Sequence, residues 1–171
     1  RVMIPIKDPR GKIVGFTGRI LGDGMPKYMN TGETEFFIKR YLLFGLDIAV
    51  NEIRKTRQAI VVEGHMDAIS LHAAGVKNAV ASMGTAFAAE QARLLKRMCD
   101  EVVFCYDSDN AGRNASVRAV SIARAAGLKV RVAGVPDGKD PDEFIRQHGK
   151  DAFLEVIKQG LDGIDYQVEE T

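Results

Sequence analysis

The sequence has few of the side chains that usually build redox centres or zinc sites. Its 171 residues include no tryptophan, three histidines and only two cysteines, Cys99 and Cys105. The spacing of these cysteines matches neither a CxxC redox pair nor a zinc knuckle. Both lie in or beside apolar runs, where a free thiol behaves as a small core hydrophobe. We therefore expect two buried free thiols and no zinc in this part of the protein.

Long hydrophobic runs are also missing. No stretch approaches the roughly 18 to 20 apolar residues that are needed to cross a bilayer. The N-terminus lacks the basic, apolar and small-residue order of a secretory signal, so we expect a cytoplasmic protein without a membrane partner. The chain opens on Arg1 inside an apolar-alternating segment and without an initiator methionine. This start favours a piece of a longer protein.

Glycine-rich phosphate loops do not occur. The sequence contains neither G-x-x-x-x-G-K-[ST] nor a strand-linked G-x-G-x-x-G. Binding of a nucleoside triphosphate would therefore depend on metal ions and basic side chains. Hydrophobic residues make up 46% and charged residues 27% of the chain, which is typical of globular domains.

The net charge of +1 conceals an uneven distribution along the chain. Residues 1–57 contain 11 Lys/Arg and 6 Asp/Glu, a net charge of +5, whereas residues 58–171 contain 13 and 17, a net charge of −4. A basic half beside an acidic half can position a polyanion against a metal site. The alternative is a chance difference between two solvated surfaces.

The first part of the chain predicts a small α+β subdomain. Residues 2–20 indicate a β-hairpin, because two apolar segments flank a turn that contains Asp-Pro and glycine. Residues 21–35 are rich in glycine and predict an ordered loop. Residues 38–55 carry apolar positions at helical spacing with a break at Gly45, which predicts two short helices.

From residue 58 onward, short apolar runs alternate with helical segments. The expected strands are 59–62, 79–81, 102–105 and 130–132, and the expected helices are 66–74, 88–98, 111–126 and 141–158. This alternation implies right-handed crossovers and a mostly parallel sheet flanked by helices, an α/β fold. We expect a basic N-terminal subdomain at 1–57, the α/β domain at 58–150, and at 151–171 a helical segment that begins the next subdomain.

Acidic residues follow the predicted strands, at the edge where open parallel sheets bind ligands. Glu63 follows the first strand, with Asp67 one turn into the next helix. The third strand and the loop after the fourth lead to two Asp-x-Asp pairs. The carboxylates expected at one rim are Glu63, Asp67, Asp107, Asp109, Asp140 and Asp142.

Carboxylates gathered at one rim repel one another and take up protons unless a cation neutralises them. Oxygen ligands without histidine or cysteine favour Mg²⁺ or Mn²⁺ over zinc. Enzymes that transfer phosphate commonly hold two such ions about 3.5 to 4 Å apart. We therefore expect two or more Mg²⁺ or Mn²⁺ ions and phosphate chemistry. Each motif alone also has a structural interpretation, such as a solvated turn or, at residues 140–142, an N-cap followed by proline.

Gly64 and Gly112 lie inside these acidic motifs. Glycine permits close approach of the backbone to a ligand, and it also serves tight strand-to-helix turns. Both interpretations remain open from the sequence.

Two of these motifs resemble the Toprim signature, which primases, type IA and type II topoisomerases and some nucleases share. They are Val-Val-Glu-Gly-His-Met-Asp at residues 61–67 and Tyr-Asp-Ser-Asp-Asn-Ala-Gly at residues 106–112. Further segments are similar to bacterial DNA primases of the DnaG type, and they lie at residues 1–6, 15–19, 26–30, 44–45 and 136–142. The resemblance extends from residue 1 to about residue 158. It implies a Toprim-like fold.

The resemblance also implies roles for single residues. Glu63, Asp107 and Asp109 would be catalytic, and they would bind metal together with Asp67, Asp140 and Asp142. The residues implied to line a basic groove for template-primer or nucleoside triphosphate are Arg19, Lys27, Tyr28, Asn30 and Lys39. Tyr28 either stacks on a base or packs against its loop, since tyrosine serves both purposes. His65 and Ser108 stand where other primases carry tyrosine and glycine, and we expect all three histidines at the surface.

The implied activity is the synthesis of short RNA primers on single-stranded DNA from ribonucleoside triphosphates. The template, the primer and the nucleotides would be partners of this chain, which we expect to be monomeric. The replicative helicase would bind a domain that is absent here, as is the zinc-binding domain of a whole primase. The alternatives are another Toprim enzyme, such as a nuclease or topoisomerase fragment, and a non-catalytic module that binds nucleotides or nucleic acid.

Overall fold

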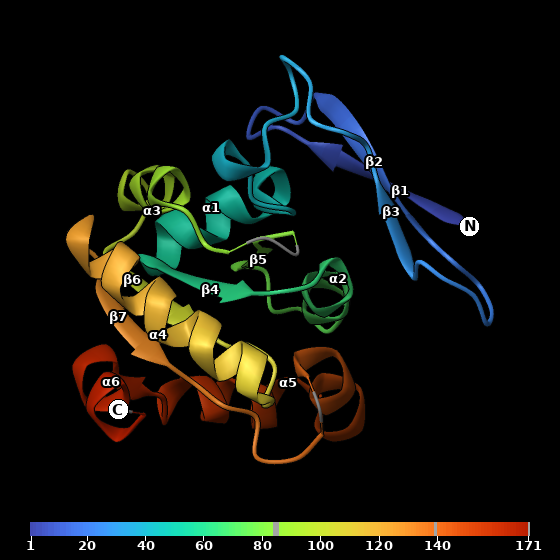
Figure 1. Ribbon diagram of the computed structural model, residues 1–171. Helices are drawn as coiled ribbons and strands as arrows, with labels where there is room; N and C mark the ends of the chain where they lie inside the picture. Colours follow the sequence, from blue (N-terminus) through green and yellow to red (C-terminus); the bar gives the residue numbers. More distant parts are fainter. Residues whose placement is uncertain (84–85, 139, 171) are drawn as a thin grey trace.

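The computed structural model describes residues 1–83, 86–138 and 140–170. It contains a three-stranded sheet with the order β1-β2-β3 and a five-stranded sheet with the order β5-β4-β6-β7-β8. Figure 1 shows the three-stranded sheet projecting from the body that holds the five-stranded sheet and its helices. Lys139, which belongs to the primase-like segment 136–142, and Thr171, the end of the expected C-terminal segment, lie outside the described residues.

The three-stranded sheet contains the predicted hairpin. Strands β1 (Val2–Lys7) and β2 (Ile13–Arg19) pair antiparallel. The Asp8 carboxylate closes their turn by accepting hydrogen bonds from the backbone N–H groups of Arg10 and Lys12, both at 2.9 Å. Strand β3 (Tyr28–Asn30) then pairs with β2, so the prediction of a loop over residues 21–35 is wrong for these three residues. A strand of three residues is too short to show an alternating pattern.

Two short elements connect the sheets, as the sequence predicts. The first, η1 (Lys39–Tyr41), is a single 3₁₀ turn, and the second is helix α1 (Leu46–Thr56). Gly45 separates them with a φ of 79°, a left-handed conformation that glycine adopts without strain.

The five-stranded sheet is mostly parallel, as predicted. Strands β5 (Ala79–Ala81), β4 (Gln58–Val62), β6 (Glu101–Phe104) and β7 (Lys129–Val132) pair in parallel, and β8 (Leu161–Asp162) adds an antiparallel edge. The helices are α2 (His65–Ala73), α3 (Ala89–Lys96), α4 (Asn110–Ala125), α5 (Pro141–Lys158) and α6 (Gly163–Glu169). Each predicted strand and helix of residues 58–158 is confirmed, with ends shifted by no more than two residues.

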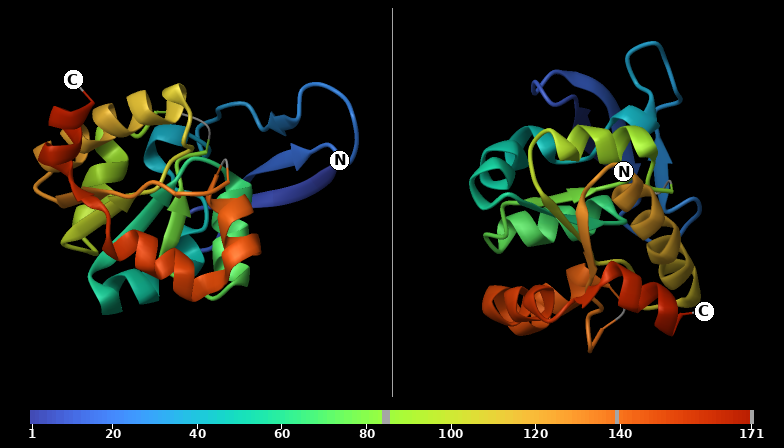
Figure 2. Two further views of the ribbon diagram at one scale, coloured as in Figure 1. Left: turned by 90° about the horizontal axis from the view of Figure 1, so that it is seen from below. Right: turned by 90° about the vertical axis from the view of Figure 1, so that its left-hand side faces the viewer.

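Helices cover both faces of this sheet, which explains the continuous apolar character of its strands (Figure 2). Helices α1, α3 and α4 pack against one face, where Val61 and Phe104 are fully buried. Helices α2 and α5 pack against the other, where the alternate residues Ile60 and Val103 are fully buried. Strands β4 and β6 therefore have no solvated face, and they carry apolar residues at consecutive positions.

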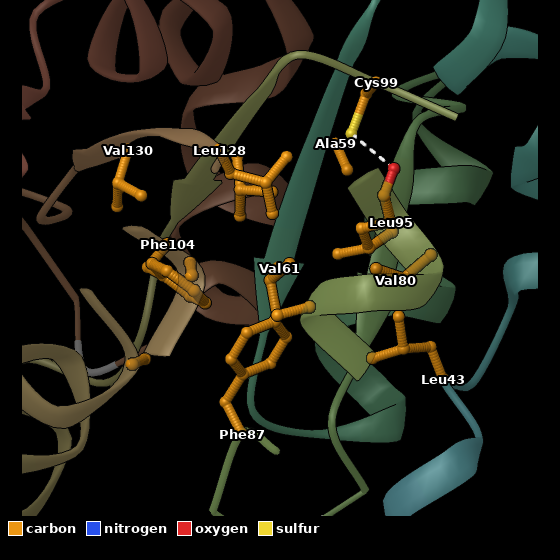
Figure 3. Close-up of a cluster of buried hydrophobic side chains, with 14 of the residues drawn as sticks. Leu43, Ala59, Val61, Val80, Phe87, Leu95, Cys99, Phe104, Leu128 and Val130 are labelled. Carbon is orange, nitrogen blue, oxygen red and sulfur yellow. Dashed lines mark hydrogen bonds between the residues drawn. The ribbon is translucent and has the colours of Figure 1, made fainter. Parts of the chain in front are cut away.

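The two cysteines lie on opposite faces of this sheet, Cys99 on the α1, α3 and α4 side and Cys105 on the α2 and α5 side. Both are free and fully buried, which confirms the prediction. Figure 3 shows the Cys99 thiol among the buried side chains on the face that α1, α3 and α4 cover, where it donates to the backbone oxygen of Leu95 at 3.3 Å. Burial raises the pKa of the Cys99 thiol to about 11 and that of Cys105 to about 12.

The residues after 150 pack on the same sheet. Helix α5 changes direction at Gly149, whose φ is 80°, and β8 then pairs with β7. Helix α6 lies against α4, where the Gln167 amide donates to the backbone oxygen of Val117 at 3.0 Å and to Ser121 at 2.7 Å. Across the described part of the chain, none of the helices combines the length and the apolar character that a membrane span requires.

Candidate metal and nucleic-acid site

A cleft of about 460 Å³ lies where the three-stranded sheet meets the carboxyl ends of β4 and β6. Its acidic side comes from the loops after β4, β6 and β7, and its basic side comes from the ends of β2 and β3. The residues that line it are Arg19, Lys27, Tyr28, Asn30, Glu63, Gly64, His65, Met66, Asp67, Met83, Asp107, Asp140 and Asp142.

Nine of the eleven predicted site residues line this cleft, and Asp109 and Lys39 do not. Asp109 is the N-cap of α4, and its carboxylate accepts a hydrogen bond from the Gly112 N–H at 2.7 Å. Its charge nevertheless raises the pKa values of Glu63 and Asp107, so it lies within electrostatic range of the cleft. Lys39 begins η1 and contributes to lowering the pKa of His65.

Glu63 and Asp107 link the ends of β4 and β6. The Glu63 carboxylate accepts a hydrogen bond from the Asp107 N–H at 3.4 Å. Partial burial, followed by the charge of Asp109, raises the pKa of Glu63 above its usual range. Burial and the charges of Glu63, Asp140 and Asp109 raise the pKa of Asp107 to about 6. Both acids therefore hold protons more tightly than exposed carboxyls do.

Asp67 is the most deeply buried of the acids on the β4 side, with 6% of its surface exposed. Its Oδ2 accepts a hydrogen bond from the Gly64 N–H and its Oδ1 accepts one from the Asp142 N–H, both at 3.1 Å. Burial and the charges of Asp107 and Asp140 nevertheless raise the pKa of Asp67 to about 7. Desolvation is the largest of these effects, and it disfavours the ionised form.

The pair at residues 140–142 has the structural role that its sequence suggests. Asp140 is the N-cap of α5, accepts a hydrogen bond from the Glu143 N–H at 2.8 Å and precedes a proline at the start of the helix. Asp142 is 8% exposed, and its carboxylate accepts hydrogen bonds from Ser70 and Arg146. Both aspartates still line the cleft, so their structural role does not remove them from the predicted site.

The acidic side suits a hard divalent cation in its chemistry. Its donors are carboxylate oxygens, and the raised pKa values of Glu63, Asp67 and Asp107 show that the folded chain opposes the ionisation of these three acids when no cation is bound. Within residues 1–83, 86–138 and 140–170, however, no three His, Cys, Asp or Glu side chains stand ready to hold one ion. A bound ion would therefore complete its coordination with water and phosphate oxygens beside one or two of these carboxylates, as Mg²⁺ commonly does.

Basic and aromatic side chains form the opposite side of the cleft. Tyr28 and Asn30 are two residues apart on β3, so both side chains point to the same face of the strand. The Arg19 guanidinium lies 5.9 Å from the centre of the Tyr28 ring, which itself lies 6.1 Å from the His65 ring. Tyr28 thus packs against its neighbours and also lines the cleft.

His65 is a cleft residue that the sequence interpretation missed. The prediction of a surface histidine is wrong, because His65 is only 6% exposed and packs edge-to-face on Phe44 with ring centres 4.9 Å apart. Burial and the charge of Lys39 lower the pKa of His65 to about 4, so the ring is neutral near pH 7. Its place between Gly64 and Met66, inside the first acidic motif, was the available signal.

The two motif glycines serve the turns of the chain. A Cβ atom on Gly112 would lie 2.1 Å from the backbone oxygen of Asp107, and one on Gly64 would lie 2.8 Å from the Asp67 carboxylate. The close approach is therefore to the acidic loops themselves. Both glycines allow the strand-to-helix turns that bring the carboxylates into the cleft.

Comparisons with known proteins agree with this arrangement. Residues 60–145 match a family model described as Toprim-like, and residues 1–50 match one described as the N-terminal domain of the DNA primase catalytic core. The DNA primase of Clostridium acetobutylicum is 48% identical over 169 residues, which cover 98% of this chain and 28% of that protein. The DNA primase of Escherichia coli is 43% identical over 164 residues, which cover 94% and 28%.

Solved structures show the same similarity. The Aquifex aeolicus primase, solved with its zinc-binding and RNA polymerase domains, superposes with a TM-score of 0.87 at 43% identity, over 94% of this chain and 40% of that one. A DnaG primase catalytic domain bound to single-stranded DNA gives 0.92 at 40% identity, over 99% and 56%. The chain spans less than a third of the length of the curated relatives. By sequence and by structure, it belongs to the DNA primase family and contains that family's Toprim-like domain.

Proposed function

We propose that this chain is the catalytic core of a bacterial-type primase, which synthesises short RNA primers on single-stranded DNA during replication. The observation that carries the proposal is the cleft itself, in which a basic sheet faces an acidic rim. A nucleotide polymerase needs both sides, because it must hold a polyanion next to divalent cations. The similarity to DNA primases over nearly the whole chain supports the same function.

The acids would hold two or more Mg²⁺ or Mn²⁺ ions. Such ions, when bound, lower the pKa of an attacking hydroxyl and neutralise the charge that develops on phosphate oxygens. Glu63, Asp107 and Asp109 are the proposed catalytic acids, because they lie in the segments that follow β4 and β6 and because the charge of Asp109 raises the pKa values of Glu63 and Asp107. The complete proposed ligand set is Glu63, Asp67, Asp107, Asp109, Asp140 and Asp142.

The reaction would be attack by a ribonucleotide 3′-hydroxyl on the α-phosphate of an incoming ribonucleoside triphosphate, with pyrophosphate as the leaving group. Glu63 would also act as an acid or base, since its raised pKa moves it toward the working pH. The other acids of the rim would act as carboxylate ligands of the metal ions.

The basic side would bind the nucleic acid and the triphosphate. Arg19 and Lys27 would neutralise phosphates from within the cleft, and Lys39 would do so from beside it. Tyr28 would stack on a base, and the Asn30 amide would donate or accept hydrogen bonds. The triphosphate would thus be held without a glycine-rich phosphate loop.

The remaining assignments are also proposals. The boundary near residue 57 is supported by the separate three-stranded sheet and by the extent of the two family models. A boundary near residue 150 is supported only by the end of the Toprim-like model at residue 145, because α5 runs through residue 150 and β8 pairs with β7 in the same sheet. In a whole primase the replicative helicase and zinc would bind to other domains, and we propose that this part is monomeric. DNA replication takes place in the bacterial cytoplasm, which is the proposed location.

Primer synthesis by the complete protein tests the proposal. The variant Asp107→Ala should abolish metal-dependent dinucleotide synthesis on single-stranded DNA, whereas Asp151→Ala, at an exposed acid on α5, should preserve it. Retained synthesis by Asp107→Ala would refute the catalytic assignment. Metal-dependent cleavage of DNA without synthesis would instead favour a Toprim nuclease.

A further inference from the structure

Two residues outside the predicted site hold the carboxylate of Asp142. The Ser70 hydroxyl, on α2, donates a hydrogen bond to Oδ1 of Asp142. Arg146, one turn later on α5, donates from Nη2 to Oδ2 and from Nε to the backbone oxygen of Asp142 at 3.3 Å. Each oxygen of the carboxylate therefore accepts one of these bonds and keeps a lone pair that can face the cleft.

Asp142 is in turn hydrogen-bonded to a second acid of the rim, Asp67. The Asp142 N–H donates to Oδ1 of Asp67, whose Oδ2 accepts from the Gly64 N–H, both at 3.1 Å. A line of hydrogen bonds thus runs from Arg146 through Asp142 and Asp67 to the start of α2. Helices α2 and α5 lie side by side on one face of the sheet, so this line joins two helix starts at one end of the cleft (Figure 2).

Arg146 is far more exposed to solvent than the aspartate that it contacts. The side chain of Asp142 is 12% exposed, whereas that of Arg146 is 68% exposed. A largely exposed arginine contributes little to the stability of the fold through its charge. Its two donors, however, approach the side chain and the backbone of the same aspartate, and a fixed guanidinium fork of this kind restricts the orientation of its partner.

We propose that Arg146, assisted by Ser70, is a positioning residue that fixes Asp142 and Asp67 for divalent-cation binding in the cleft. The inference rests on the proposed function only in that the cleft binds such a cation. Hydrogen-bond partners of ligating carboxylates typically change metal affinity by about 10- to 100-fold when they are removed. An effect of this size is expected from the loss of Arg146.

A simple charge effect would have the opposite sign. Arg146 is a positive charge beside an acidic rim, so its removal makes the rim more negative and should tighten cation binding by Coulomb attraction. Loss of orientation should weaken binding, because the carboxylates must then be ordered when the ion binds. The direction of the change therefore separates positioning from charge.

The test is a titration of this chain with Mn²⁺ in which electron paramagnetic resonance measures the concentration of the free ion. Arg146→Gln should weaken Mn²⁺ binding by about 10- to 100-fold. Arg146→Lys keeps the charge without the fork and should recover part of the affinity, and Ser70→Ala should cause a smaller loss. Arg124→Gln, at an exposed arginine near the end of α4 and beside the starts of β6 and β7, should bind as the wild type does.

Unchanged or tighter Mn²⁺ binding by Arg146→Gln would overturn the proposal, as would a wild-type chain that does not bind Mn²⁺ at millimolar concentration. Circular dichroism melts of the variants should match the wild type, which excludes a general loss of fold as the cause of weak binding. The binding measurement needs no primer synthesis. If the Asp107→Ala assay refutes the polymerase assignment, the Mn²⁺ titration still tests the role of Arg146. If the titration refutes the role of Arg146, the Asp107→Ala assay still tests the polymerase assignment.

Discussion

The burial of Asp67 makes a prediction about how the stability of the metal-free chain depends on pH. Its pKa is about 7 in the folded chain, whereas the ordinary value of an aspartate is 3.8. Between these values the folded state binds more protons than the unfolded state, so the free energy of unfolding falls as pH rises. Three pKa units correspond to about 4 kcal/mol, and this destabilisation is complete above pH 7.

The substitution Asp67→Asn removes this titration. Asparagine has one carbonyl oxygen, so it can accept from either the Gly64 N–H or the Asp142 N–H, and the lost bond costs about 1 to 2 kcal/mol. At pH 5 this loss offsets most of the stability that the variant gains because it has no buried carboxyl to ionise. At pH 8 the relief of the buried charge exceeds it, so the variant should be the more stable protein. The difference in unfolding free energy, variant minus wild type, should rise by about 3 kcal/mol between these two pH values.

Urea unfolding at a series of pH values, with EDTA present, measures this difference. Asp151→Asn, at an exposed acid on α5, is the matched control and should show a flat difference. A flat or falling curve for Asp67→Asn would refute the argument that Asp67 is forced to ionise in a poorly solvated position. Saturating Mg²⁺ should reduce the advantage of the variant, because an ion bound to the wild type stabilises its ionised form.

Three shorter predictions follow from the same structure. Gly112→Ala should destabilise the chain by several kcal/mol, because the added Cβ would lie 2.1 Å from the backbone oxygen of Asp107. Thermal melting measures this loss, and the control Gly22→Ala, where the space around the glycine is open, should melt as the wild type does. Lys27→Ala in the complete protein should weaken binding of single-stranded DNA and reduce the slope of log affinity against log salt by about 0.7; an unchanged slope in fluorescence anisotropy would contradict a phosphate contact. Cys99 and Cys105 should react with iodoacetamide only as fast as the chain unfolds, since both thiols are buried with raised pKa values; rapid labelling of the native chain, followed by mass spectrometry, would argue against their burial.

The sequence was most informative where burial on both sides of an element determines its composition. Strands β4 and β6 lie between two helical layers, so their consecutive apolar residues predicted a parallel sheet correctly. The same pattern located the acidic residues, because it marks the end of each strand. Strand β3 could not be predicted in this way, since its residues form a strand only by pairing with β2.

The contacts within the site were less predictable than its members. Ser70 and Asp142 are 72 positions apart, and nothing in the local sequence of either residue indicates their contact. Arg146 and Asp142 have the i,i+4 spacing of an ordinary helical ion pair, which usually lies on a solvated surface. The hydrogen bond from Ser70 on α2 and the place of Asp142 in the lining of the cleft show that this ion pair lies at the site.

The two sides of the cleft favour joint occupancy by a cation and a polyanion. Without a cation, the acidic rim holds carboxylates whose raised pKa values reflect the cost of ionising them together. Without a polyanion, Arg19 and Lys27 face the same space with their charges solvated. A divalent cation makes the rim less repulsive to phosphate, and a bound triphosphate supplies further oxygen ligands to the cation. In the proposed function each ligand would therefore lower the cost of binding the other, and the basic and acidic residues on opposite sides of the cleft agree with such joint binding.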